Sequence, residues 1–149
     1  MAMSRAARLA PVVEMAESVE KKAAQRVGHF QGQVNLSHAK LAELEKFRSG
    51  YQEQWMTHGS RGVSGQWLMN YQRFLNQLET AVAQQHKSLA WHQGNLNSAR
   101  VVWQKAYARV EGLRKLVLRY AEEARRLEDR REQRLLDELS QRLPQREQY

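Results

Sequence analysis

The side chains that most often catalyse reactions or bind metals are sparse in this sequence of 149 residues, which contains no cysteine. No histidine lies four residues from another, as the two ligands of a zinc-binding helix do. No acidic cluster is expected to face inward, as a di-iron helical bundle requires. The five histidines are His29, His38, His58, His86 and His92. We therefore expect no metal and no cofactor.

A short glycine cluster is the other candidate for chemistry, because glycine-rich loops can cradle phosphates. The cluster, residues 57–65, contains three glycines with serines between them. It has no Gly-Lys-Ser/Thr ending and no preceding strand, so it indicates a turn rather than a phosphate loop. Without a concave pocket to bring reactive groups together, we expect a protein that is not an enzyme and has no small-molecule substrate.

The elements that carry these residues follow from apolar side chains spaced alternately three and four residues apart, the signature of a coiled coil. We call these positions the seam. The seam runs without interruption from Ala6 to Trp55 and again from Leu68 to Leu127. Its strict seven-residue period predicts a left-handed supercoil. Five seam positions are polar and are expected to fix the register of the helices, namely Glu20, Ser37, Arg48, Gln85 and His92.

Two seam-bearing helices joined by a short glycine loop predict an all-α fold, an antiparallel left-handed coiled-coil hairpin. We expect one coiled-coil domain over residues 1–149, with helix 1 at about 4–57, the tip loop at 58–64 and helix 2 at about 65–143. Ser64 can cap the second helix. Helix 2 is longer and should overhang its partner beyond about Tyr120. The overhang carries a separate stripe of leucines, Leu135, Leu136, Leu139 and Leu143.

The net charge of +8 favours acidic partners, which include nucleic acid, anionic lipid and acidic protein surfaces. From Arg100 onward, however, thirteen basic residues interleave with nine acidic ones, and no nucleic-acid-binding motif is present. Nucleic acid is therefore the less favoured partner. The absence of cysteine, of a long apolar run and of a secretion signal predicts a cytoplasmic protein.

Large apolar side chains also lie off the seam near the predicted tip, namely Phe47, Trp67 and Phe74. Folding the hairpin at residue 61 or 62 brings a stripe on each helix together into one surface, which we call the tip patch. This surface is either an extension of the seam or a site for a protein partner. The tip patch consists of Lys40, Leu44, Phe47, Tyr51, Phe74, Leu78, Ala81 and Gln85.

Several segments resemble one known family. The stretch Asn70-Tyr-Gln-Arg-Phe74 follows the predicted tip, Leu44-Glu-Lys-Phe-Arg-Ser-Gly-Tyr51 precedes it, and Trp103 lies in the second helix. A charged C-terminal end, Arg131-Glu-Gln-Arg134 with Asp137 and Glu138, completes the pattern. Together with length and hairpin architecture, these features resemble the FliJ family, soluble components of the bacterial flagellar type III export apparatus.

The resemblance implies partners that the spacing of residues does not. It implies a stalk-like protein of flagellum biogenesis and motility, peripherally associated with the inner membrane at the export gate. Such a protein would bind the hexameric export ATPase FliI, promote its assembly and activity, and contact the export gate protein FlhA and substrate chaperones. The tip patch would contact FlhA. Arginines at the helix termini, which we call the helix-end arginines, would face the ATPase: Arg5, Arg8, Arg119, Arg125, Arg126, Arg130 and Arg131.

Three alternatives stay open at this point. The chain could be a stalk protein of a virulence-type III secretion system, which also forms a helical hairpin. It could be a basic coiled coil that binds nucleic acid. It could also be a scaffold that holds secretion substrates or their chaperones through the leucine stripe near Leu136.

Overall fold

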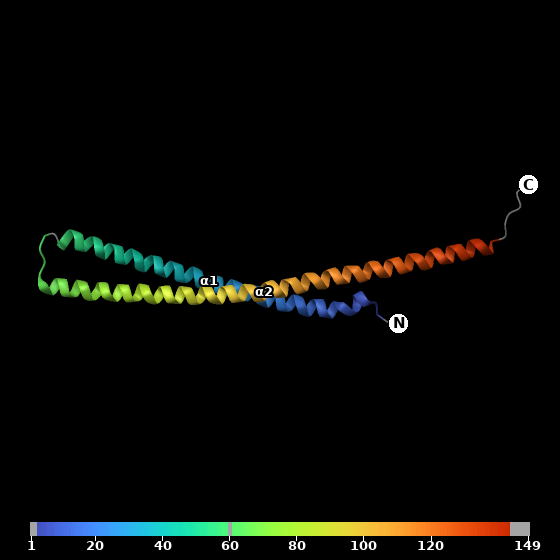
Figure 1. Cartoon of the computed structure of the whole chain (residues 1–149), viewed down its shortest axis with the longest axis horizontal. Helices are drawn as coiled ribbons and strands as arrows, with labels where there is room; N and C mark the ends of the chain where they lie inside the picture. Colours follow the sequence, from blue (N-terminus) through green and yellow to red (C-terminus); the bar gives the residue numbers. More distant parts are fainter. Residues whose placement is uncertain (1–2, 60, 144–149) are drawn as a thin grey trace, which may run out of the picture. The chain divides into compact units, whose positions relative to one another are not determined.

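Two long helices make up the computed structural model, which describes residues 3–59 and 61–143. Helix α1 spans Arg5–Gly59 and helix α2 spans Gly65–Arg142, with no strand among the described residues (Figure 1). The two helices run antiparallel on either side of the tip turn. The predicted all-α hairpin with a longer second helix is therefore confirmed. Each helix boundary lies within two residues of the expected position.

Serine caps begin both helices. The backbone N–H of Trp67 donates to the Ser64 hydroxyl at 3.2 Å, which confirms the cap expected there. At the start of α1 the N–H of Ala7 donates to the Ser4 hydroxyl at 3.1 Å. In the turn, Gly62 has a φ of 80°, a conformation that side chains with a Cβ disfavour. These local features explain why the helices begin where they do.

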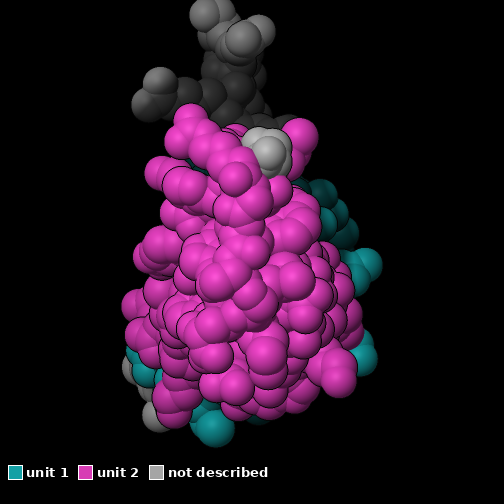
Figure 2. Space-filling view, turned by 90° about the vertical axis from the view of Figure 1, so that its left-hand side faces the viewer, with its two compact units in different colours: residues 1–20, 105–149 teal, residues 21–104 magenta. Residues whose placement is uncertain are grey.

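The chain divides into two compact units, which are described separately. Unit 1 comprises residues 1–20 and 105–149, and unit 2 comprises residues 21–104 (Figure 2, teal and magenta). Each unit contains one part of α1 and one part of α2. In the part of the chain that the structure describes, no helix is long and apolar enough to cross a membrane.

The core of unit 2 is a narrow line of seam residues. Its buried cluster is continued by partly buried Val27, Phe30 and Leu44, which pack against it. Burial of each such aliphatic side chain contributes about 1.5–3 kcal/mol. The cluster consists of Val34, Leu41, Val82, Leu89 and Leu96. Since every member belongs to the predicted seam, the apolar spacing correctly identified the buried face.

The polar seam residues differ in how they are accommodated. Ser37 is buried, and its backbone carbonyl oxygen accepts a hydrogen bond of 3.4 Å from the Gln85 side chain. This bond joins α1 to α2 in one register. The Nδ1 atom of His92 is buried and has no hydrogen-bond partner among the described residues. The hydrogen bond between Gln85 and Ser37 therefore helps to fix the register of the two helices. At His92, by contrast, a buried nitrogen is left without a hydrogen bond.

In unit 1 the seam ends before α2 does. Ala16 and Val110 are buried, whereas every residue from 121 to 143 is exposed. Leu127, the last seam residue of the sequence, is therefore exposed although its spacing is that of a core position. The reason is the length of α1, which begins at Arg5 and leaves the end of α2 without a partner helix.

Candidate functional site

Stacked aromatic rings line the tip of the hairpin in unit 2. The ring of Tyr71 lies 5.4 Å from that of Trp67 and 5.3 Å from that of Trp55, and both pairs are stacked. Trp55 and Trp67 lie 6.1 Å apart. Such pairs contribute about 0.5–1.5 kcal/mol each beyond the area they bury. The tip is therefore held by aromatic packing as well as by the seam, and we call these three residues the aromatic stack.

A hydrogen bond fastens the aromatic stack to the first helix. The Tyr71 hydroxyl donates to the backbone carbonyl oxygen of Tyr51 at 3.0 Å. Burial raises the pKa of Tyr71 above 10.0, and the nearby Tyr51 phenol acts in the same direction. A tyrosine phenol is protonated at neutral pH, and the raised pKa keeps Tyr71 a hydrogen-bond donor further into the alkaline range.

Part of the predicted tip patch is presented to solvent beside this stack. Phe74 stacks face to face on Tyr51, with ring centroids 5.2 Å apart and an interplanar angle of 3°. Phe47 and Phe74 are 57% and 51% exposed. A hollow of about 180 Å³ adjoins Phe74. It is lined by Tyr51, Gln54, Trp67, Asn70, Tyr71 and Phe74. The exposed Phe74 ring beside this hollow and the exposed Phe47 ring of the other helix are candidate anchors for a protein partner.

The other members of the tip patch are less available. Leu44 packs against the core of unit 2, and the Gln85 side chain is engaged with Ser37. Leu78 and Ala81 are half-buried, while Lys40 is exposed at the edge. The structure therefore brings Tyr51 and Phe74 into contact and leaves Phe47, Phe74 and Lys40 as the outward-facing members.

The predicted tip patch did not include Trp55, Trp67 or Tyr71, although Trp67 was one of the large side chains expected to lie off the seam. A usable signal was present, because folding about residue 61 places Trp55 level with Trp67 and Tyr51 level with Tyr71. The seam pattern assigned Trp55 and Tyr71 to the core and said nothing of sideways stacking onto Trp67. The contact depends on how far these large rings extend past the seam.

The helix-end arginines lie in unit 1 and are all exposed. The Arg5 guanidinium carbon lies 4.9 Å from the centroid of the Tyr120 ring, a cation–π contact that joins the start of α1 to α2. Arg126 donates to Glu122 at 2.9 Å one turn earlier on the same helix. The structure thus brings Arg5 and Arg119 to one region, because Arg119 adjoins Tyr120, and places the other α2 members along the exposed overhang.

An apolar groove that the sequence did not predict lies between the helices in unit 1. It has a volume of about 490 Å³. At its edge Arg114 binds Glu17 at 3.2 Å and Glu111 at 3.0 Å. The hydrogen bond to Glu17, followed by that to Glu111, raises the pKa of Arg114. The groove is lined by Ala6, Ala10, Val13, Glu14, Glu17, Arg114, Val117 and Leu118.

The overhang of α2 is the third exposed surface. Its leucines, Leu135, Leu136, Leu139 and Leu143, are all more than half exposed. They alternate with charged residues on a helix segment that touches no other helix within its unit. Among the described residues, no group of three or more metal-ligating side chains comes together.

Comparison with known proteins gives a consistent result. The family model described as "Flagellar FliJ protein" matches residues 4–149. A flagellar FliJ protein of Escherichia coli K12 is 25% identical over 134 residues, which cover 90% of this chain and 91% of the relative. A flagellar FliJ protein of Salmonella typhi is 24% identical over 140 residues, which cover 94% and 95%.

The fold also has a counterpart among solved structures. A structure described as a YscO homolog from Chlamydia trachomatis superposes with a TM-score of 0.69 at 21% identity. The superposition covers 95% of this chain and 94% of that chain. The likeness shows that the two chains share the fold of a helical hairpin.

Proposed function

The chain belongs to the FliJ family and is a component of the flagellar export apparatus, and from this premise we propose that it is a non-enzymatic adaptor between the export ATPase FliI and the export gate FlhA. The observation that carries the proposal is the match to the family over residues 4–149. Two separate exposed surfaces, the tip patch and the helix termini, support an adaptor with one partner at each.

The tip patch is proposed to bind FlhA. Aromatic side chains that are already held in place lose little conformational entropy on binding, and they are frequent anchors of protein interfaces. Phe74 meets this requirement, because it is stacked on Tyr51, whose backbone is in turn fixed by Tyr71. Phe47, on the other helix, adds a second exposed ring.

The helix termini are proposed to enter the hexameric ATPase ring. In support, the helix-end arginines are exposed, and residues 121–143 leave the end of α2 free to be covered by other chains. The apolar groove beside Arg114 provides a further area that a ring subunit could cover. Binding of this kind supplies no chemistry. It promotes assembly and activity by favouring some conformations of the ring over others.

The remaining proposed properties follow from the same role. The protein would act in the cytoplasm at the membrane-embedded gate, and it would receive substrate chaperones that have delivered their cargo. The leucine stripe near Leu136 is a candidate surface for those chaperones, since it is exposed and apolar.

Binding to FlhA can be tested by calorimetry with the purified cytoplasmic region of FlhA. We expect Phe47→Ala with Phe74→Ala to weaken binding at least about tenfold, since two anchoring rings are removed. The matched control is Met56→Ala with Met69→Ala, which removes two exposed apolar side chains near the tip but outside the patch. Circular dichroism must show equal helicity. Equal weakening by both variants, or none by the first, would contradict the assignment.

A further inference from the structure

Acidic residues are missing from two long stretches of the sequence. No aspartate or glutamate lies between Glu20 and Glu43, and none lies between Glu79 and Glu111. Within unit 2 these stretches comprise residues 21–42 and 80–104. They contain six basic residues, Lys21, Lys22, Arg26, Lys40, Lys87 and Arg100. The positive charge of the protein is therefore concentrated in segments without neighbouring carboxylates.

The fold places these two stretches side by side. Ser37 of the first accepts a hydrogen bond from Gln85 of the second, and Gln31 accepts one from Arg100 at 3.2 Å. We call residues 21–42 and 80–104 together the basic belt. It differs from the helix-end arginines, which lie in unit 1, and it meets the tip patch only at Lys40, Ala81 and Gln85.

Contacts of the belt arginines leave their positive charge uncompensated. Arg100 binds the neutral amide oxygen of Gln31. Arg26 lies over the Phe30 ring, with 5.8 Å between its guanidinium carbon and the ring centroid. The carboxylate of Glu45, from outside the belt, lies 3.8 Å from His86. A neutral amide and an aromatic ring orient a guanidinium but do not cancel its field, so the belt attracts anionic partners.

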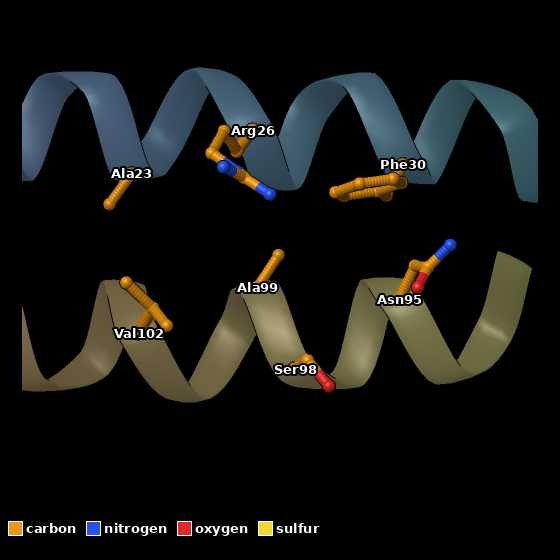
Figure 3. Close-up of a pocket in the computed structure, with 7 residues that line it drawn as sticks. All are labelled: Ala23, Arg26, Phe30, Asn95, Ser98, Ala99 and Val102. Carbon is orange, nitrogen blue, oxygen red and sulfur yellow. The ribbon is translucent and has the colours of Figure 1, made fainter.

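A groove of about 230 Å³ lies beside Arg26, near one end of the basic belt (Figure 3). Two of its lining residues, Ala23 and Ala99, are buried, and in Figure 3 Ala23 lies opposite Val102 while Ala99 lies opposite Arg26. Because alanines are small, they leave space between the larger side chains of Phe30 and Val102. Val102 is 56% exposed. Arg26 lies at the edge of the groove, and with Lys22 and His29 it also lines an adjoining hollow beside Phe30.

The spacing of charge distinguishes among anionic partners. Lys22 and Arg26 are four residues apart on α1, which is about 6 Å along the helix axis at 1.5 Å per residue. Double-stranded DNA carries one phosphate charge per about 1.7 Å of axis, a much denser array. An α-helix with one carboxylate per turn repeats at about 5.4 Å. The belt therefore matches an acidic helix better than a nucleic acid.

We propose that the basic belt docks an acidic amphipathic helix of a partner protein. An apolar side chain of that helix fills the groove between Phe30 and Val102. Its carboxylates, one turn apart, pair with Lys22 and Arg26. This interaction surface is additional to the tip patch, the helix termini and the leucine stripe near Leu136, and it does not depend on the proposed contacts with FliI or FlhA.

The test uses the full-length protein and a fluorescently labelled synthetic helical peptide that carries one glutamate per turn beside a leucine stripe. Binding is measured by anisotropy, with circular dichroism to confirm that each variant is equally helical. We expect binding at 50 mM salt that weakens as salt is added. Lys22→Glu with Arg26→Glu should weaken it at least about tenfold. The control Arg109→Glu with Lys115→Glu changes the net charge equally outside the belt and should have little effect.

Three results would overturn the proposal. The first is equal binding by the belt variant and the control variant. The second is equal binding of a peptide with the same composition but a scrambled order, because charge alone would then suffice without the groove. The third is tighter binding of a 20-base-pair DNA duplex that the same Lys22 and Arg26 substitutions abolish, which would assign the belt to nucleic acid.

Discussion

Tyr71 and Tyr51 are joined across the hairpin, since the Tyr71 hydroxyl donates to the Tyr51 carbonyl oxygen at 3.0 Å. The same Tyr51 carries the exposed Phe74 ring stacked on its own. This arrangement links the aromatic stack, through the buried Tyr71, to the surface proposed to bind FlhA. A substitution at Tyr71 should therefore affect both stability and the tip patch.

Removing the Tyr71 hydroxyl tests how much its hydrogen bond to Tyr51 contributes to stability. Tyr71→Phe keeps the ring in the aromatic stack but deletes the hydrogen bond, which typically contributes about 0.5–1.5 kcal/mol. We expect the free energy of unfolding, measured with urea, to fall by about 1 kcal/mol with helicity unchanged. No loss of stability would mean that water replaces this bond without penalty.

The ionisation of Tyr71 gives a second prediction. Its pKa is raised in the folded state, chiefly by burial, so folding favours the protonated phenol. The stabilisation is fully present below pH 10 and is lost as the pH rises through the folded-state pKa. Absorbance titration of tyrosinate should show a late-titrating tyrosine that is missing from Tyr71→Phe. If both proteins titrate alike, Tyr71 is not shielded from water.

The seam core can be tested with two leucines of the same helix. Leu89 belongs to the buried cluster, whereas Leu136 is exposed on the overhang. We expect Leu89→Ala to lower the free energy of unfolding by about 2–4 kcal/mol, since it leaves a cavity. Leu136→Ala should change it by less than about 0.5 kcal/mol. Similar effects would mean that the overhang is packed in solution.

Truncation tests the proposed role of the overhang. A chain that ends at Tyr120 loses only residues that are exposed or undescribed, so the rest of the hairpin should keep its helicity and melting temperature. Stimulation of FliI ATPase activity should nevertheless fall, because most helix-end arginines are removed. A truncated chain that still stimulates fully would place the ATPase contact elsewhere in the molecule.

Much of the fold could be predicted from the sequence because a seven-residue repeat determines which side of a helix is buried. Val34, Leu89 and the Ser64 cap followed from spacing and residue type alone. The seven-residue repeat of one helix does not indicate whether a second helix is present to cover its apolar side. Leu127 continues the seam pattern and is exposed, since α1 does not extend far enough to cover it.

The candidate surfaces were less predictable, because they depend on contacts beside the seam. The outward position of Phe47 and Phe74 followed from helical spacing. The stacking of Trp67 on Tyr71 and the groove between Phe30 and Val102 depend on side-chain size at one level of both helices. To predict such features, one must know which residues of the two helices lie opposite each other, and the periodicity of a single helix does not provide this.

The central claim is that one protein joins the export ATPase to the export gate. The most direct test immobilises the cytoplasmic region of FlhA and measures how much FliI it retains with and without this protein. We predict that FliI is retained only when the protein is present, and that Phe47→Ala with Phe74→Ala abolishes retention while FliI stimulation persists. Equal retention of FliI without the protein, or with the variant, would contradict the account.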